Sequence, residues 1–310
     1  MTKHYQKIFC TFATDMKKQE LSVLIPTYNH VCVTLVKQLL PLLEAATVSY
    51  EVLVADDGST DADTIAGNQV INQMAHCRYI VRQENAGRAA IRNFLADQSQ
   101  YDKLLFLDCD AQVKDKEFLK KYMEASRNAC VVCGGLTHPD EIPQKGQELR
   151  YLYEKNAAFE RSAGFRSQNP YLRFTSFSFL INRYEFMKIR FDESYVRYGY
   201  EDVQFGHELE ANGVSILHID NPLAHVGLDD SASYLNKTRQ AVQNAFDHKN
   251  EIGDSSKLLT HYNKVKRIRM RWLFRFIWVF FQRSMEKNLL GPKPGLRIFS
   301  LYKLCYICMM

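Results

Sequence analysis

Apolar runs and amphipathic segments alternate along the first half of the chain. Short apolar runs predict five buried strands, at residues 21–25, 50–55, 77–81, 103–107 and 129–133. Apolar positions at helical spacing predict helices between them, at residues 31–46 (interrupted by Pro41), 61–75, 86–98 and 114–127. Strands that alternate with helices predict repeated βαβ units. We therefore expect an α/β fold with a mostly parallel sheet flanked by helices.

The second half of the chain has longer and less regular elements. The pattern predicts a polar loop at residues 137–147, strands at 174–181, 214–217 and 223–226, and helices at 201–211 and 231–250. Basic and aromatic residues then dominate and indicate a helical C-terminal tail. These changes divide the chain into an N-terminal extension (1–20), a main domain (21–250, with halves 21–135 and 136–250) and the tail (251–310).

Charge is distributed unevenly between the main domain and the tail. The 310 residues are 46% apolar and 24% charged, which fits a soluble globular protein and excludes wholesale disorder. The net charge is +5, but eleven basic residues and one acid, Glu286, give +10 between Lys264 and Met310, so the preceding residues carry −5. A basic tail favours a polyanionic partner, either nucleic acid or an anionic membrane. The acidic main domain is not typical of a nucleic-acid binder.

The cysteines and the N-terminal residues indicate the cellular compartment of the protein. Most of the eight cysteines lie within apolar runs of a long chain, which favours buried thiols in a reducing compartment. The CxxC pairs Cys130/Cys133 and Cys305/Cys308 leave a joint zinc site as a less favoured alternative. The first twenty residues lack the apolar region of a signal peptide, and no apolar run reaches the ~18 residues of a membrane span. We expect a cytoplasmic protein.

Polar clusters follow three of the predicted strands, at residues 26–29, 56–59 and 108–110. Ligands bind at the carboxyl ends of the strands of a parallel sheet, so these clusters predict a single site. Asp108 and Asp110 suit a hard cation with oxygen ligands, and the alternative is a capping acid beside a solvated acid. The chain contains neither GxxxxGKS/T nor GxGxxG, so phosphate binding by those loops is not predicted.

Three further groups of residues have a structural and a functional interpretation. Asp56 and Asp57 fit a turn before a helix N-cap, or hydrogen bonds to a base or a ribose. The pair Glu201-Asp202 fits ordinary acid enrichment at a helix start, or a general base whose pKa is raised by tyrosines and burial. His225 fits a structural histidine, or a nitrogen ligand if the aspartates hold a metal.

Taken together, these residues resemble the family 2 glycosyltransferases, which have the GT-A fold with a Rossmann-like nucleotide-binding sheet. The resemblance runs from about Leu21 to Gly227. It rests on five segments in the expected order: residues 24–29 (LIPTYN), 56–59 (DDGS), 85–93 (NAGRAAIRN), 108–110 (DCD) and 199–202 (GYED) with 169–179, followed by the late histidine of 224–227 (AHVG).

The resemblance implies an inverting transfer of a sugar from a UDP-sugar to a hydroxyl of a glycan or lipid-linked acceptor. It makes residues 21–135 the nucleotide-binding half and 136–250 the acceptor half. It implies Asp202 as the catalytic base and Glu201 as the residue that orients the acceptor. It implies nucleotide contacts from Pro26, Thr27, Tyr28, Asn29, Asp56, Asp57, Arg88 and Asp108. It also implies Mn²⁺ or Mg²⁺ on Asp108, Asp110 and His225. The chain has Tyr200 where Trp or Gly is common, which leaves the acceptor open.

Two other classes of protein compete with this interpretation. A sugar-nucleotide nucleotidyltransferase shares the architecture and the metal, but it usually has a glycine-rich, lysine-containing loop near its N-terminus. Residues 24–30 contain neither Gly nor Lys. A non-catalytic, membrane-bound scaffold would not need Asp108, Asp110, Asp202 and His225 to converge.

The tail has a membrane interpretation and a packing interpretation. Lys264, Arg267, Arg271 and Arg275 fall on one predicted helical stripe beside a dense aromatic run. Basic residues with Trp and Phe suit a helix that lies in the interface of an anionic membrane, and this excludes nucleic acid as the preferred partner. The alternative is a helix that packs on the main domain. We expect a peripheral protein at the inner face of the plasma membrane.

Overall fold

The computed structural model describes residues 19–139 and 144–310. The expected N-terminal extension (1–20), which includes Cys10 and the segment considered as a signal peptide, lies almost wholly outside the described residues. Residues 140–143 of the expected polar loop lie outside them as well.

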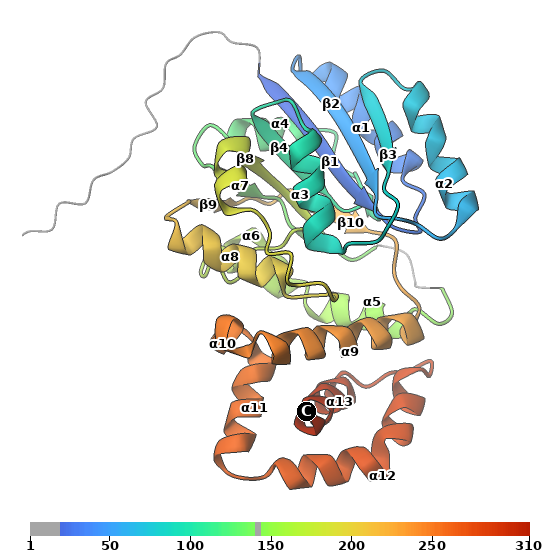
Figure 1. The fold of residues 1–310 in the computed structure, drawn as a ribbon, viewed down its shortest axis with the longest axis vertical. Coiled ribbons are helices and arrows are strands. Elements are labelled where there is room, and N and C mark those ends of the chain that lie inside the picture. Colours follow the sequence, from blue (N-terminus) through green and yellow to red (C-terminus); the bar gives the residue numbers. More distant parts are fainter. Residues whose placement is uncertain (1–18, 140–143) are drawn as a thin grey trace, which may run out of the picture.

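A seven-stranded sheet forms the centre of the main domain (Figure 1). Its order is β3 (Cys77–Val81), β2 (Ser49–Asp56), β1 (Glu20–Thr27), β4 (Lys103–Leu107), β8 (Ser178–Asn182), β6 (Val131–Cys133) and β9 (Ile216–His218). The first four strands are parallel, and β6 is parallel to β9, whereas β8 is antiparallel to both of its neighbours. The predicted α/β fold with a mostly parallel sheet is confirmed.

Helices cover both faces of this sheet. Alternate residues of β1 point to opposite faces, so Val23 and Ile25 join one hydrophobic cluster and Leu24 joins another. The first cluster packs under α1 (Val33–Ala45) and α4 (Phe118–Ala125). The second packs under α3 (Arg88–Gln98), α7 (Arg183–Ile189) and α8 (Glu201–Ala211). The apolar strands are therefore buried on both sides, as parallel strands usually are.

Two helices differ from the sequence-based prediction. The first, α1, continues through Pro41, where we predicted an interruption. Pro41 is exposed, so water can reach the carbonyl that the missing proline N–H leaves unpaired. The predicted helix at 61–75 is instead α2 (Ala62–Asn68) followed by the 3₁₀ helix η1 (Gln69–Gln73). The break falls at Asn68, which is buried because its side chain bonds the backbone of His30 and Cys32.

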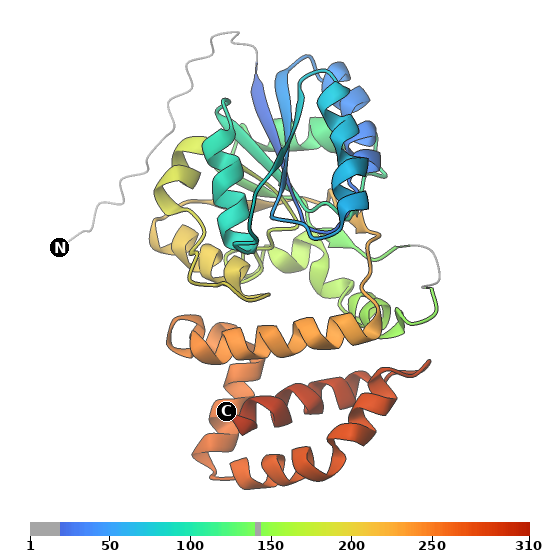
Figure 2. The same ribbon diagram turned by 45° about the vertical axis from the view of Figure 1, so that its right-hand side comes forward.

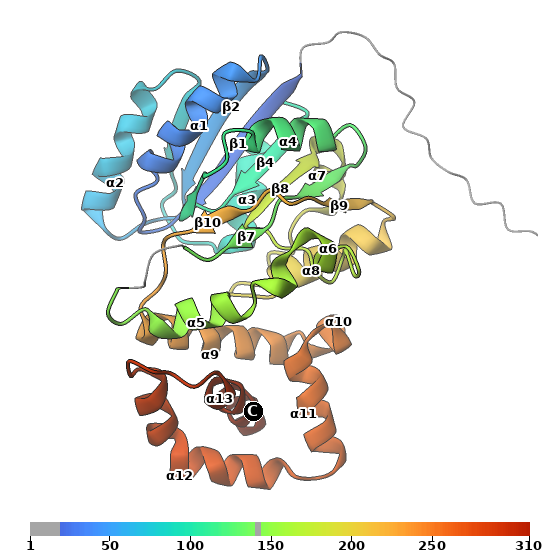
Figure 3. The same cartoon turned by 180° about the vertical axis from the view of Figure 1, so that it is seen from behind.

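A second, three-stranded sheet lies beside the carboxyl ends of the main strands (Figure 3). Its central strand, β10 (Leu223–His225), is antiparallel to β5 (Ala111–Gln112) and parallel to β7 (Leu136–Thr137). The register pairs His225 with Ala111. It thereby brings the histidine next to Asp110, although the two are 115 positions apart in the chain.

The helices below this edge complete the main domain and form the tail (Figure 2). They are α5 (Glu148–Asn156), η2 (Phe159–Arg161), α6 (Ala163–Arg166), α9 (Ser231–Asp247), α10 (Lys249–Ile252), η3 (Gly253–Ser255), α11 (Lys257–Arg267), α12 (Arg271–Leu289) and α13 (Leu296–Met309). Apolar side chains of α5, α9, α12 and α13 share one cluster. No helix in the described part of the chain is long and apolar enough to cross a bilayer.

The two CxxC pairs lie apart in the fold. Cys133 is buried in the sheet cluster of the main domain, whereas Cys305 is buried among the tail helices. The joint zinc site that their spacing left open does not form, because the pairs belong to different cores.

Candidate active site

A cavity of about 580 Å³ opens at the carboxyl ends of β1, β2 and β4. Its wall includes many of the residues predicted from sequence: Pro26, Thr27, Tyr28, Asn29, Asp57, Arg88, Asp108 and Asp110. Helix α9 closes the other side with Ser233, Asn236, Lys237 and Gln240. The strand ends therefore converge on one site, because the first four strands are parallel and finish at the same edge.

The loop after β1 is tied to the loop after β2. Asn29 has a positive φ of 48°, a conformation that asparagine tolerates better than most residues. Its side-chain oxygen accepts hydrogen bonds from the backbone N–H groups of Thr60 (2.9 Å) and Asp61 (3.1 Å). Its own N–H donates to the Ser59 hydroxyl at 2.7 Å. Two segments thirty residues apart are thus held as one rim of the cavity.

The neighbouring aspartates after β2 have different environments. Asp56 is fully buried and accepts hydrogen bonds from the Tyr79 hydroxyl (2.5 Å) and the Ser59 N–H (2.7 Å). Its carboxylate therefore stabilises the loop that follows β2. Asp57 lies on the cavity wall and accepts from Arg82 at 2.8 Å and from the Gly87 N–H at 2.8 Å. Burial raises the pKa of Asp57, although these donors partly oppose the shift. Asp57 is therefore the one of the pair that faces the cavity.

Two arginines one turn apart on α3 hold two of the predicted carboxylates. Arg88 donates to Glu201 at 2.7 Å and to Asp108 at 3.0 Å. Arg92, which is almost fully buried, donates to the other oxygen of Asp108 at 2.6 Å. The structure thus pairs Asp108 with arginines. Arg92 was not predicted, although its spacing of four residues from Arg88 on a predicted helix was a usable signal.

Glu201 and Asp202 begin α8 directly behind Arg88. Burial would raise the pKa of Glu201, but the nearby Arg88 and Arg92 lower it, so this carboxylate stays charged. Burial and then the charge of Glu201 raise the pKa of Asp202 to about 7. A carboxylate that holds a proton near neutral pH is suited to general-base work, because its pKa matches the operating pH.

His225 bridges two carboxylates. Its Nε2 lies 2.9 Å from Asp110 Oδ2 and its Nδ1 lies 2.7 Å from Glu154 Oε1. Burial would lower the pKa of His225, but the bonds to Asp110 and Glu154 raise it to about 9. Despite burial, the same histidine lowers the pKa of Asp110 to about 2. Glu154 is fully buried on α5, and Arg150 also contacts it at 2.7 Å. No sequence pattern pointed to Glu154.

The Asp110–His225 pair fits a divalent metal that arrives with a phosphorylated ligand. Within the described residues no cluster of three or more His, Cys, Asp or Glu side chains could hold a metal by itself. Asp110 Oδ1, however, is buried and has no hydrogen-bond partner there. Mg²⁺ is typically held by one or two carboxylates together with substrate phosphates, so two protein ligands suffice for such a site.

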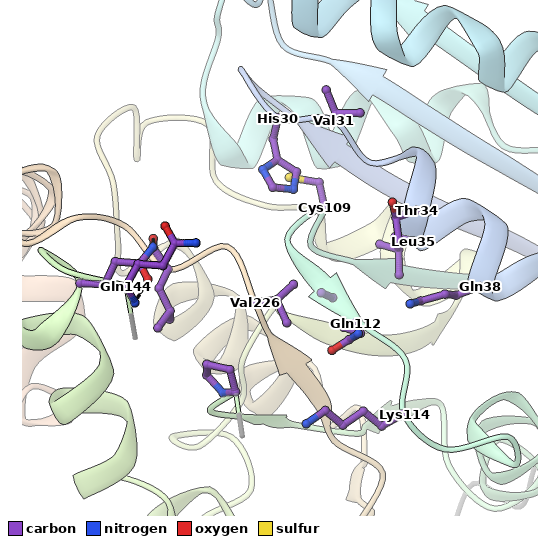
Figure 4. A pocket seen from close by; sticks show the side chains of 14 residues that line it. His30, Val31, Thr34, Leu35, Gln38, Cys109, Gln112, Lys114, Gln144 and Val226 are labelled. Carbon is purple, nitrogen blue, oxygen red and sulfur yellow. Dashed lines mark hydrogen bonds between the residues drawn. The ribbon is translucent and has the colours of Figure 1, made fainter. Parts of the chain in front are cut away.

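A second cavity of about 540 Å³ adjoins the first and shares His30 and Cys109 with it. Figure 4 shows His30 beside Cys109, with Gln38 of α1 at the right, Lys114 at the bottom and Gln144 at the left. None of the predicted catalytic, nucleotide-binding or metal-binding residues lines this second cavity. Most of the predicted nucleotide-binding residues and Asp110 line the first cavity, whereas Asp56, Glu201, Asp202 and His225 lie outside its lining.

Several proteins of known sequence are similar to this chain. Chondroitin synthase of Escherichia coli is 25% identical over 237 residues, which cover 66% of this chain and 34% of the relative. Hyaluronan synthase of Pasteurella multocida is 24% identical over 235 residues, which cover 66% of this chain and 24% of the relative. The chain thus spans well under half of the length of these two relatives.

Solved structures share the fold. The mannosyltransferase PcManGT of Pyrobaculum calidifontis, in complex with GDP-Man and Mn²⁺, gives a TM-score of 0.55 at 14% identity, over 94% of this chain and 86% of that chain. Residues 1–349 of S. aureus TarS, in complex with UDP, give a TM-score of 0.50 at 18% identity, over 93% and 89%. These likenesses support the GT-A fold that the sequence motifs implied.

The profile of Glycosyl transferase family 2 matches residues 22–190, more than half of the chain. The match covers the cavity rim, both arginines of α3 and the Asp108–Asp110 loop. It favours an enzyme of glycosyl transfer over a sugar-nucleotide nucleotidyltransferase and over a non-catalytic scaffold. The chain therefore belongs to glycosyltransferase family 2.

Proposed function

We propose that the enzyme transfers a sugar from a UDP-sugar, with inversion, to a hydroxyl of a glycan or lipid-linked acceptor in polysaccharide or surface-glycan synthesis. The observation that carries the proposal is Asp202, a carboxylate with a pKa near 7 beside the arginine cluster of the cavity. The names of the relatives, chondroitin synthase and hyaluronan synthase, support a polysaccharide product. The UDP and GDP-Man complexes of the structural neighbours support a nucleotide-sugar donor.

The donor would occupy the cavity with its nucleoside against the rim. Pro26, Thr27, Tyr28, Asn29 and Asp57 line that rim and offer polar and aromatic contacts. Arg88 and Asp108 line the same cavity and contact each other, and a ribose and a diphosphate would lie against them. Asp110 and His225 would hold Mn²⁺ or Mg²⁺ with help from Asp108, and the metal would neutralise charge on the diphosphate.

The reaction needs a base and a leaving group on opposite sides of the sugar. Asp202 accepts the proton of the acceptor hydroxyl, whose oxygen forms the new bond to the anomeric carbon as the bond to the diphosphate oxygen breaks. A single displacement of this kind inverts the anomeric configuration. Glu201 orients the acceptor, and its bond to Arg88 holds that arginine toward the diphosphate. Arg88 then offsets negative charge as the diphosphate departs.

Asp202→Asn tests the assignment of the base. We expect transfer to be lost while UDP binding, measured by calorimetry with Mn²⁺, stays within about twofold, because Asn keeps the shape but cannot take the proton. UDP release across a panel of UDP-sugars, with and without Mn²⁺, identifies the donor and provides the activity assay. An Asp202→Asn variant that transfers at nearly the wild-type rate would contradict the assignment.

The proposal includes a location. The enzyme would act as a peripheral protein at the inner face of the plasma membrane, where lipid-linked acceptors are accessible. Between Lys264 and Met310 the tail has eleven basic residues and one acid, which supports attachment to an anionic surface.

A further inference from the structure

Helix α12 exposes an apolar stripe along its outer side. Trp272, Phe276, Val279 and Phe280 follow the spacing of one helical face, and their exposed fractions are 66%, 51%, 67% and 66%. The rings of Phe276 and Phe280 lie side by side, with centroids 4.5 Å apart. Ile268, just before the helix, is also exposed. Contiguous exposed apolar side chains of this size mark interaction sites on soluble proteins.

The opposite side of α12 is firmly packed. Trp278, Met285 and Leu289 are buried in one cluster with side chains of α5, α9 and α13. In Figures 1 and 2, the first part of α12 lies at the end of the molecule farthest from the central sheet, and the rest of the helix turns back toward α9. The helix is therefore an ordered part of the fold, and the stripe is not needed for its core.

Cations extend and flank this stripe. Arg283 and Lys287 continue it along the helix, and Arg267 and Arg269 precede it; all four are exposed. None of the four forms an ion pair with a described carboxylate. Arg271 and Arg275 behave differently, because both donate to the carbonyl of Cys308 near the end of α13. The stripe predicted from sequence (Lys264, Arg267, Arg271, Arg275) is therefore divided between solvent and the tail core.

We propose that the outer face of α12 lies in the interface of an anionic lipid bilayer. Trp272, Phe276, Val279 and Phe280 would insert at the boundary of the acyl chains, and Arg283 and Lys287 would meet lipid phosphates. The inference rests on the proposed membrane location and names the surface responsible for it. Unpaired cations beside the apolar stripe argue against a second copy of the chain as the occupant, because a two-fold contact would place like charges together.

Vesicle flotation of the full chain tests this surface. We expect the wild type to float with vesicles of phosphatidylcholine and phosphatidylglycerol and to remain at the bottom with phosphatidylcholine alone. Phe276→Gln with Phe280→Gln should lower partitioning into vesicles by at least about tenfold, because two rings that would insert among the acyl chains are lost. Phe281→Gln is the matched control, since Phe281 is also 52% exposed but is turned about 180° from Trp272 around the helix.

Tryptophan fluorescence gives a second readout. The chain has two tryptophans, of which Trp272 is exposed and Trp278 is 9% exposed. Mixed vesicles should shift the emission of the wild type to the blue, and Trp272→Phe should remove that shift. Flotation of the Phe276→Gln/Phe280→Gln protein at the wild-type level would overturn the proposal. So would a wild-type dimer in centrifugation that these substitutions convert to a monomer without any vesicle binding.

The proposal of sugar transfer and the proposal of a membrane-binding face on α12 can be contradicted independently. Phe276 and Phe280 lie outside the cavity, so their double variant should bind UDP like the wild type. A wild type that floats but transfers no sugar would contradict the catalytic proposal alone. A wild type that transfers sugar to a water-soluble acceptor but ignores anionic vesicles would contradict the membrane surface alone.

Discussion

Asp202 and Glu201 are adjacent carboxylates with opposite pKa shifts. Arg88 and Arg92 keep Glu201 charged, and that charge together with burial makes ionisation of Asp202 harder. The division follows from geometry, because Arg88 donates a hydrogen bond directly to Glu201, whereas Asp202 accepts one from the Val203 N–H. One carboxylate thus fixes an arginine while the other remains free to exchange a proton near neutral pH.

The pH dependence of transfer should report on Asp202. The folded pKa is about 7, above the ordinary 3.8, so the base is protonated and inactive below neutrality. We expect kcat/KM to rise with pH through about 7. The raised pKa also stabilises the fold at low pH, and this contribution is lost as pH rises through 7. Asp202→Asn should remove this contribution to the pH dependence of the free energy of unfolding. A kcat/KM that is level from pH 5 to pH 8 would contradict this assignment.

Glu154 should act as a positioning residue for the metal site. Its bond to His225 Nδ1 fixes the ring so that Nε2 faces Asp110. Glu154→Gln should weaken Mn²⁺ binding in the presence of UDP by roughly 10–100-fold, as loss of such supporting contacts usually does. Electron paramagnetic resonance of free Mn²⁺ measures this without turnover. Glu124→Gln, at an exposed carboxylate of α4, is the control and should bind Mn²⁺ normally.

The sequence predicted site residues that belong to local motifs and missed those that depend on tertiary contacts. Asp57, Asp108, Asp110 and His225 could be proposed because each stands in a recognisable short segment. Glu154 is 71 positions from His225, and no spacing rule links them. The distinction between Asp56 and Asp57 depends on the Tyr79 hydroxyl, which comes from a different strand.

At the scale of elements, the pairing of β10 with β5 brings His225 beside Asp110, the two residues of the proposed metal site. The strands are only three and two residues long, but the backbone N–H of Val226 also donates to the Asp110 carbonyl at 3.0 Å. Gly227 follows, and its Cα faces the Asp110 side chain so closely that a Cβ there would overlap with it. The close approach explains why a glycine stands at this position.

Gly227→Ala should therefore displace Asp110 without unfolding the protein. We expect metal-dependent UDP affinity to fall on the order of tenfold or more, because Asp110 would no longer be held in the orientation that binds the metal. Calorimetry with and without Mn²⁺ measures the effect, and circular dichroism checks the fold. Gly164→Ala is a suitable control, because a Cβ at Gly164 meets no atom within 4 Å. Equal losses in both variants would argue against a specific contact with Asp110.

The elements of the first half were predictable from the sequence because their strands are continuous apolar runs with helices between them. The second half was harder to predict. Strand β8 inserts between β4 and β6 and runs against both, and β6 and β9 are only three residues long. Such short strands carry little periodic signal, and their order in the sheet depends on long-range pairing.

At the scale of the whole molecule, a polar network joins the tail to α9. The Tyr302 hydroxyl lies 2.7 Å from Arg239 Nε and 3.0 Å from Glu286 Oε1, and Arg239 also contacts Glu286 at 2.5 Å. Tyr302 is fully buried, so the network sits at the centre of the contact between α9, α12 and α13. Packing of α13 and one side of α12 on the main domain is therefore compatible with a free outer side of α12.

Tyr302→Phe should reduce the free energy of unfolding by about 1–3 kcal/mol, because two charged partners lose a buried hydroxyl. Chemical denaturation monitored by circular dichroism measures the change. Ser300→Ala, at an exposed position of the same helix, should change it by less than about 0.5 kcal/mol. A Tyr302→Phe protein as stable as the wild type would show that the network contributes no net stability.

Helix α9 contacts the cavity with one side and the tail with the other. Ser233, Asn236, Lys237 and Gln240 line the cavity, whereas Tyr234, Leu235 and Arg239 contact the tail. The tail is consequently not a detachable module. A chimera joined at residue 251 would pair a foreign tail with a surface shaped for the native one. A graft that begins at Ser231 would carry one wall of the cavity along with the tail, and it would still leave behind the contacts that α5 makes in the same apolar cluster.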